Sequence, residues 1–135
     1  MKHDGSRASI YATSGGLPAC KWIRLACQRH LDDLVRPDIY YDLDEEFKRI
    51  SFIETILTLE DGSPMKLFDW QIFFLGNLYC WKRNDTGLRR FKNATLFIPR
   101  KSGKSALLAA MMISSLVMDG VAYGQAYAVA ADRGQ

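Results

Sequence analysis

Cysteine is scarce in this 135-residue chain, and its spacing excludes two structural roles. Cys20, Cys27 and Cys80 are odd in number and contain no CxxC pair, so they predict neither a disulfide framework nor a metal site. The two histidines, His3 and His30, are far apart, and His30 falls on a predicted helix, which disfavours a catalytic or ligand role for either. We therefore expect a reducing compartment.

The chain also lacks a recognisable secretion signal and a membrane-spanning run. Residues 1–16 are polar and rich in Gly and Ser, without the apolar centre of a signal peptide. The longest near-continuous apolar run, Ala106 to Met118, is interrupted by Ser114 and Ser115 and is too short to cross a bilayer. With 48% apolar and 24% charged residues, the composition is that of an ordinary folded protein. The expectation is a soluble, cytoplasmic chain with no membrane partner.

Positive charge is concentrated in one stretch, although the formal net charge is only +3. From Lys82 to Lys104, eight lysines and arginines stand against Asp85 alone, which gives this stretch a net charge of +7 and leaves −4 for the remainder. A focused positive field suits a polyanionic ligand. The alternative is a solvated basic hairpin without a binding role, formed by the first five of these residues, Lys82, Arg83, Arg89, Arg90 and Lys92.

Apolar periodicity predicts four helices. Apolar residues at three- and four-residue spacing indicate a helix over Pro18 to Leu34, and a second helix begins in the acidic stretch Asp42 to Glu46 and continues to Leu57. After a turn at residues 61–64, Asp69 is the predicted N-cap of an aromatic helix that reaches Trp81. The fourth helix, Lys104 to Met118, is apolar nearly all round, which indicates a sandwiched position.

Two apolar stretches predict parallel strands on either side of the fourth helix. Phe91 to Ile98 follows a turn at residues 84–87, is apolar on both faces from Ala94, and is stopped by Pro99; Gln125 to Ala131 is the second. The expected organisation is a flexible leader (1–16), a helical lead-in (17–81) and a strand, loop, helix, strand unit (82–135). The predicted fold class is α/β, and the sheet looks like the front part of a larger domain.

The loop between the first strand and the fourth helix carries the strongest motif. Gly103-Lys104-Ser105 matches the end of the phosphate-binding pattern Gly-x4-Gly-Lys-Ser/Thr, but Ile98 stands where the first glycine belongs. In this interpretation the N–H groups of residues 101–105 surround phosphate oxygens, Lys104 bridges the β- and γ-phosphates, and Ser105 offers its hydroxyl to Mg²⁺. Arg100 adds a cation for the γ-phosphate, or it is a surface arginine that balances local carboxylates.

A Trp70-Gln71 dipeptide at the start of the aromatic helix supplies a second candidate feature. The amide of Gln71 can pair with both N6 and N7 of adenine, which would favour ATP over GTP. The alternative is an aromatic core helix, which explains the aromatic residues but not the glutamine among them.

Three segments together resemble the large subunit of phage and prophage terminases, the motors that package viral DNA. They are Phe68-Asp69-Trp70-Gln71, Ile98 to Ser105, and Ala128 to Gln135, and the likeness covers roughly residues 17–135. In that family the first loop glycine is commonly absent and an arginine follows the strand, so Ile98 and Arg100 agree with the resemblance.

The resemblance implies an ASCE-type P-loop ATPase sheet, present here in part and preceded by N-terminal helices. It implies ATP and Mg²⁺ as cofactors, and double-stranded DNA, a small terminase subunit, a portal ring and a homo-oligomeric ring as partners in a bacterial host cytoplasm. The implied cofactor-binding residues are Trp70, Gln71, Pro99, Arg100, Lys101, Ser102, Gly103, Lys104 and Ser105, with Arg100 and Lys104 as the catalytic candidates and Ser105 as the metal ligand.

The chain shows no apolar strand that ends in Asp-Glu and no acidic nuclease cluster, so we expect the 135 residues alone to bind nucleotide poorly and not to hydrolyse it. Two alternatives to a truncated terminase piece stay open. One is part of a helicase-like DNA translocase, and the other is a non-enzymatic basic DNA-binding or interaction module with a vestigial phosphate loop.

Overall fold

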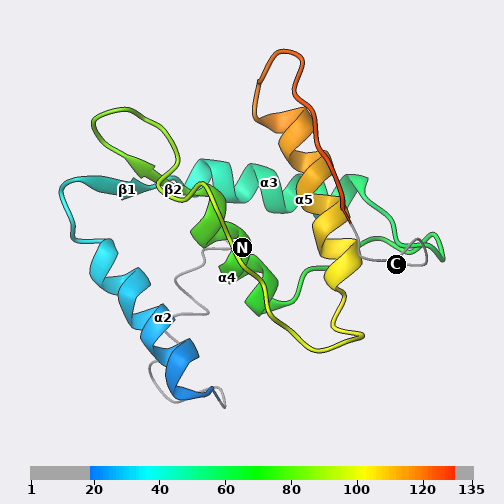
Figure 1. Ribbon diagram of the computed structural model, residues 1–135, viewed down its shortest axis with the longest axis horizontal. Helices are drawn as coiled ribbons and strands as arrows, with labels where there is room; N and C mark the ends of the chain where they lie inside the picture. Colours follow the sequence, from blue (N-terminus) through cyan, green and yellow to red (C-terminus); the bar gives the residue numbers. More distant parts are fainter. Residues whose placement is uncertain (1–18, 130–135) are drawn as a thin grey trace. The chain divides into compact units, whose positions relative to one another are not determined.

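The computed structural model describes residues 19–129, which form four helices and two short strands (Figure 1). The chain divides into two compact units, of which the first ends at Phe97 and the second begins at Ile98. In chain order the elements are α2 (Lys21–Asp33), β1 (Ile39–Tyr41), α3 (Leu43–Ile56), α4 (Asp69–Tyr79), β2 (Trp81–Arg83) and α5 (Lys104–Met118). The first unit therefore holds all elements but α5. The leader predicted for residues 1–16 lies outside the described residues.

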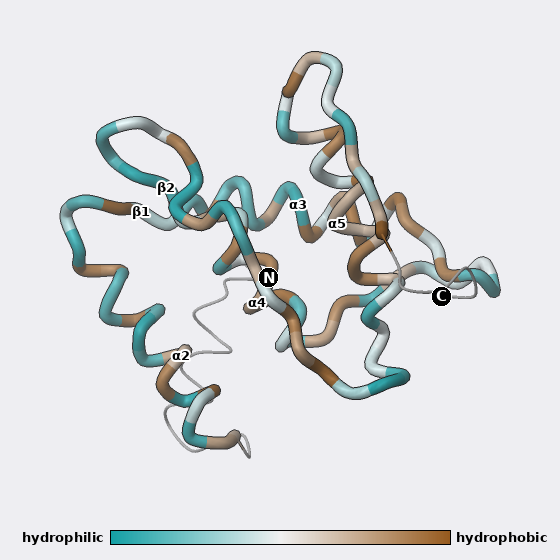
Figure 2. Tube along the Cα trace, viewed as in Figure 1, coloured by the Kyte–Doolittle hydropathy of each residue, from teal (hydrophilic) through white to brown (hydrophobic). Residues whose placement is uncertain are grey.

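Helix α2 confirms the helix predicted over Pro18 to Leu34. Polar and apolar residues alternate along it (Figure 2), and its buried residues are Cys27, His30 and Asp33. The predicted inward-facing stripe is only partly correct, because Trp22 is 73% exposed. The buried contacts of α2 are thus concentrated in its C-terminal half.

Helix α3 begins as its sequence predicts. Asp42 is the N-cap, and its Oδ1 accepts a hydrogen bond from the backbone N–H of Glu45 at 2.9 Å. The acidic residues of the first turn complement the positive end of the helix dipole. The predicted turn that follows is also present: Gly62 has φ +80°, and Asp61 accepts hydrogen bonds from the N–H and hydroxyl of Ser63.

The sheet of the first unit consists of β1 and β2, paired antiparallel with Ile39 opposite Arg83 and Tyr41 opposite Trp81. The sequence interpretation missed both strands. Trp81 is fully buried, and its ring meets those of His30 and Tyr41 edge-on at centroid distances of 5.4 and 5.1 Å. These contacts join α2 to the sheet, and they place His30 in the core of the unit.

Helix α5 has the bounds predicted from the sequence, Lys104–Met118. The two predicted parallel strands do not form in the described residues: residues 91–98 and 125–129 have no strand conformation, and Phe97 is fully exposed. A strand requires a neighbour to pair its N–H and C=O groups, and no described segment pairs with either stretch. The end of the second predicted strand, residues 130–131, lies outside the described residues. The chain is mixed α/β as predicted, but its sheet is antiparallel, and the P-loop sheet stays a prediction.

Candidate functional site

The segment from Pro99 to Ser105 forms a turn that runs directly into α5. Lys101 and Gly103 both have positive φ values, 66° and 72°. Glycine adopts this conformation without strain, whereas a lysine is held there at a cost of about 1–3 kcal/mol. Ser102 between them is half-buried. The strained lysine is the kind of backbone outlier that functional loops retain.

Gly103 is the N-cap of α5, and it offers no side chain to the first turn. No side-chain cap hydrogen bond is formed there, so the N–H groups at the start of α5 have no acceptor from a capping side chain. Lys104 is the first helical residue and Ser105 the second. Unsatisfied N–H groups and the positive end of the helix dipole make this turn suitable for an anion.

The cations of this loop have no carboxylate partner within residues 19–129. Arg100 and Lys101 are exposed and Lys104 is half-buried, and none of the three forms an ion pair there. Among the described residues, therefore, Arg100 does not balance a local carboxylate. Three uncompensated positive charges beside a helix N-terminus attract a polyanion.

Gln71 has a structural partner that the sequence did not reveal. Its Oε1 accepts a hydrogen bond from the backbone N–H of Phe68 at 2.9 Å, and the side chain is 3% exposed. Phe68 is the N-cap residue of α4, so the prediction of Asp69 as N-cap is wrong. Asp69 instead occupies the first helical turn, where its charge suits the helix dipole. Capping by Gln71 explains a glutamine among aromatic residues.

The structure brings the predicted site residues together in two groups. Trp70, 38% exposed, lies next to Gln71 at the start of α4 in the first unit, and residues 99–105 form one turn in the second unit. The two groups therefore belong to different compact units.

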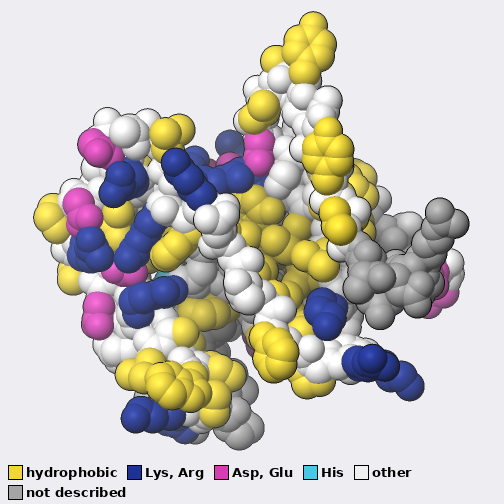
Figure 3. Space-filling view, viewed as in Figure 1, with side chains coloured by type: hydrophobic (Ala, Val, Ile, Leu, Met, Phe, Trp, Pro, Cys, Tyr) yellow, Lys and Arg dark blue, Asp and Glu magenta, His cyan; other side chains and the backbone are white. Residues whose placement is uncertain are grey.

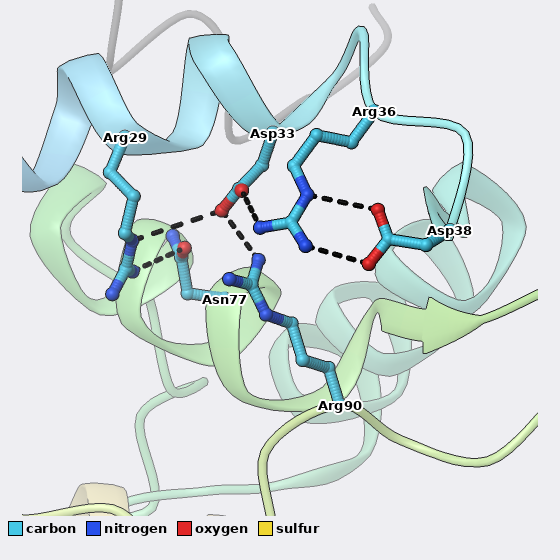
Figure 4. A network of polar contacts seen from close by, with 6 residues as sticks. All are labelled: Arg29, Asp33, Arg36, Asp38, Asn77 and Arg90. Atoms are coloured by element: carbon cyan, nitrogen blue, oxygen red, sulfur yellow. Dashed lines mark hydrogen bonds and ion pairs between the residues drawn. The ribbon is translucent and has the colours of Figure 1, made fainter.

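Three of the five basic residues before the loop have partners in the first unit. Lys82 Nζ lies 2.6 Å from Asp42 Oδ2, and Arg90 lies 2.5 Å from Oδ2 of Asp33 (Figure 4). The guanidinium of Arg89 stacks on a tyrosine ring of α4 at 4.6 Å. Figure 3 shows the lysines and arginines of this region interspersed with acidic side chains. For these three residues, the contacts favour the alternative in which the basic hairpin has no binding role.

The first unit also buries ionisable groups that the sequence interpretation did not single out. Glu46 and Arg49 are each 1% exposed. Burial, together with nearby carboxylates, raises the pKa of the Cys80 thiol to about 12, and burial also raises the pKa of Tyr41 far above its ordinary value. The Cys80 thiol and the Tyr41 hydroxyl are therefore uncharged at neutral pH.

Among the described residues, no group of three or more His, Cys, Asp or Glu side chains is arranged to hold a metal ion. No helix in that part of the chain has the length and apolar character needed to cross a membrane.

Residues 69–135 match the family model of the terminase large subunit, ATPase domain. The matched range begins at Asp69 and includes Trp70, Gln71 and the whole loop from Pro99 to Ser105. The match supports a terminase large subunit fragment over these residues, and the resemblance found in the sequence is confirmed. No curated protein and no solved structure matches the chain.

Proposed function

We propose that residues 99–105 bind the phosphates of ATP, and that the chain is the ATP-binding portion of a terminase motor. The observation that carries this proposal is the start of α5. There a glycine N-cap leaves the first N–H groups without a side-chain acceptor, beside Arg100 and Lys104, which form no ion pair within residues 19–129. The family match over the same residues supports it. A triphosphate provides the negative charge that would balance the cations and N–H groups of this turn.

Each loop residue has a distinct role in this proposal. Lys104 contacts the β- and γ-phosphates, and the N–H groups of residues 101–105 donate to phosphate oxygens. Arg100 stabilises charge on the γ-phosphate from within the same chain. The hydroxyl of Ser105 is the protein ligand to Mg²⁺, which neutralises phosphate charge when bound.

The base is recognised at the start of α4 in the same proposal. Trp70 offers a partly exposed ring for stacking, and the Gln71 amide pairs with N6 and N7 of adenine. Gln71 is 3% exposed, and its Oε1 already accepts a hydrogen bond from the N–H of Phe68. Base recognition of this kind would favour ATP over GTP.

The activity proposed for the whole subunit is ATP-driven packaging of double-stranded DNA, with a small subunit, a portal ring and further copies of the chain as partners. The family match supports this role. For the 135 residues alone we propose nucleotide binding without hydrolysis. This part of the proposal rests on the sequence, which shows no apolar strand that ends in Asp-Glu.

A nucleotide titration tests the phosphate loop. A fluorescent ATP analogue with Mg²⁺ is titrated against the chain and against Lys104→Ala, and we expect affinity to fall about tenfold or more, because a charged hydrogen bond is worth about 1.5–3 kcal/mol. Lys92→Ala is the matched control, since Lys92 is an exposed cation of the same basic stretch outside the loop. Equal affinity of the wild type and Lys104→Ala, or no binding by either, would contradict the proposal.

A DNA titration distinguishes the proposed nucleotide-binding function from the alternative of a basic DNA-binding module. Duplex binding is measured across salt concentration, with and without nucleotide. A steep salt dependence that nucleotide does not change would favour a basic DNA-binding module. The engagement of Lys82 and Arg90 with carboxylates already removes two cations from such a module.

A further inference from the structure

Glu54 lies in a position that its own helix does not favour. It is the third residue from the end of α3 (Leu43–Ile56), and the last turn of this helix carries no basic residue. A carboxylate there is opposed by the negative end of the helix dipole. Even so, its side chain is only 21% exposed. The contacts that stabilise the Glu54 carboxylate therefore come from outside α3.

The main partner of Glu54 is a backbone group of the segment before α4. Its Oε1 accepts a hydrogen bond from the N–H of Leu67 at 3.0 Å. Its Oε2 also faces the ammonium of Lys66 at 3.8 Å, but the Lys66 side chain is 72% exposed and solvent screens this pair. A charged acceptor on a backbone N–H is the stronger of the two contacts.

The contact belongs to a series that fixes the chain from Met65 to Phe68. The N–H of Met65 donates to the carbonyl of Leu57 at 3.0 Å, the N–H of Leu67 to Glu54, and the N–H of Phe68 to Oε1 of Gln71 at 2.9 Å. Met65 is itself buried. Glu54 and Gln71 thus hold two consecutive N–H groups, so Glu54 sets the backbone that orients the Gln71 amide.

A fixed amide distinguishes adenine from guanine. Because Oε1 of Gln71 already accepts from Phe68, the oxygen end of the amide is assigned and the nitrogen end remains the donor. Adenine offers a donor at N6 and an acceptor at N7, which match the two ends. Guanine offers acceptors at O6 and N7, so an oxygen held in place meets O6 unfavourably, whereas a freely rotating amide could turn its nitrogen toward both.

We propose that Glu54 is a positioning residue that sets the preference for adenine over guanine nucleotides. It acts through Leu67 and Phe68 on the amide of Gln71. The inference rests on the proposed function, since it requires a base at the start of α4. Glu54 lies outside the segment that matches the terminase family, so this proposal gives a residue of α3 a role that the family match does not cover.

The test compares affinities for fluorescent ATP and GTP analogues, each with Mg²⁺, in the full 135-residue chain. Glu54→Ala removes the carboxylate, and Glu54→Asp shortens it so that it no longer reaches the N–H of Leu67. Each variant should lower the ATP:GTP affinity ratio about threefold to tenfold, because one hydrogen bond is lost. Glu54→Gln keeps a carbonyl acceptor and should restore the ratio. Lys66→Ala, which removes only the exposed partner, should leave the ratio unchanged. Faster amide exchange at Leu67 in Glu54→Asp should accompany the lower ratio.

The outcomes separate this inference from the function on which it rests. An ATP preference that falls in Glu54→Asp and returns in Glu54→Gln supports the role of Glu54. An unchanged ratio in every Glu54 variant overturns that role and leaves the nucleotide site intact. Equal wild-type affinities for ATP and GTP overturn base recognition at Gln71 but not the phosphate loop. No binding of either nucleotide overturns both.

Discussion

Asp42 combines two roles at one carboxylate, as the N-cap of α3 and as the partner of Lys82. Partial burial opposes its charge, but the hydrogen bonds from Lys82 and from the Glu45 N–H outweigh burial and hold the pKa of Asp42 below its ordinary value of 3.8. The same hydrogen bond raises the pKa of Lys82 above 10.5. The Asp42 contribution to stability is complete above pH 3.8 and is lost as pH falls through the lowered pKa. The Lys82 contribution is complete below pH 10.5 and is lost as pH rises through the raised pKa.

The Asp42→Asn variant isolates the charge, because asparagine is also a good N-cap. We expect it to lower the free energy of unfolding by about 1 kcal/mol at pH 7, since the pair is partly exposed. The difference from the wild type should shrink as pH falls well below 3.8. Urea denaturation at pH 7 and at pH 2.5 measures this, and an equal difference at both values would show that the ion pair is not responsible.

Gly76 lies inside α4 because a larger residue has no room there. A Cβ built on Gly76 would overlap the hydroxyl of Tyr41 and would lie 3.2 Å from Oε1 of Glu46. Alanine is the better helix former by about 1 kcal/mol, yet Gly76→Ala should destabilise the chain by about 1–3 kcal/mol through overpacking. In a Tyr41→Phe background the loss should be smaller, as a double-mutant cycle of unfolding free energies would show. Stabilisation by Gly76→Ala would refute the close approach.

At the scale of elements, one buried carboxylate attaches α2 to the chain after β2. Asp33 is 4% exposed and accepts from Arg36 at 3.2 Å and from Arg90 at 2.5 Å, while Arg36 also pairs with Asp38 (Figure 4). Its neighbour Asp32 is exposed and accepts a hydrogen bond from Gln28 within the helix. The two adjacent aspartates therefore have very different environments.

Asp33→Asn should cost about 1–3 kcal/mol of stability, because it removes one charge from a network whose arginines are partly exposed. Asp32→Asn is the matched control and should cost less than about 0.5 kcal/mol. Denaturant unfolding measures both, and amide exchange in the C-terminal half of α2 should accelerate only in Asp33→Asn. Equal effects of the two substitutions would assign the loss to helix propensity.

The sequence predicted the helices better than the sheet, for a physical reason. The start of α3 depends on Asp42 and that of α5 on Gly103, and these are local signals that a sequence displays. Strands β1 and β2 have three residues each and pair across about forty positions, so neither carries a local pattern. The predicted parallel strands depend on neighbours that the described residues do not supply.

The candidate site shows the same division. The loop motif is contiguous and could be found from Gly103-Lys104-Ser105, whereas the cap that Gln71 provides and the contact of Glu54 with Leu67 are tertiary. A glutamate near the C-terminal end of α3 is unfavourable, and this position could have indicated from the sequence that Glu54 has a partner elsewhere. It could not have indicated which partner. Tertiary hydrogen bonds to backbone groups leave almost no trace in a single sequence.

At the scale of the whole molecule, the basic stretch contributes to both compact units. Lys82 and Arg90 are neutralised by carboxylates in the first unit, whereas Arg100 and Lys101 in the second have no such partners among the described residues. Part of the unpaired positive charge of the described residues therefore lies at the loop, and part lies at the exposed Arg83 and Lys92 before it. Binding of a negatively charged ligand at the loop should consequently protect the exposed backbone of residues 99–101.

Limited proteolysis tests this coupling in the intact chain. Residues 99–101 are exposed and form no sheet, so trypsin should cleave after Arg100 or Lys101 before it cleaves after Lys48 or Arg49 in α3. ATP with Mg²⁺ should slow this cleavage at least severalfold, because phosphate contacts hold the same backbone. The protection should be lost in Lys104→Ala and kept in Lys92→Ala, with fragments identified by mass spectrometry. First cleavage inside α3, or equal protection in both variants, would show that the loop is not where nucleotide binds.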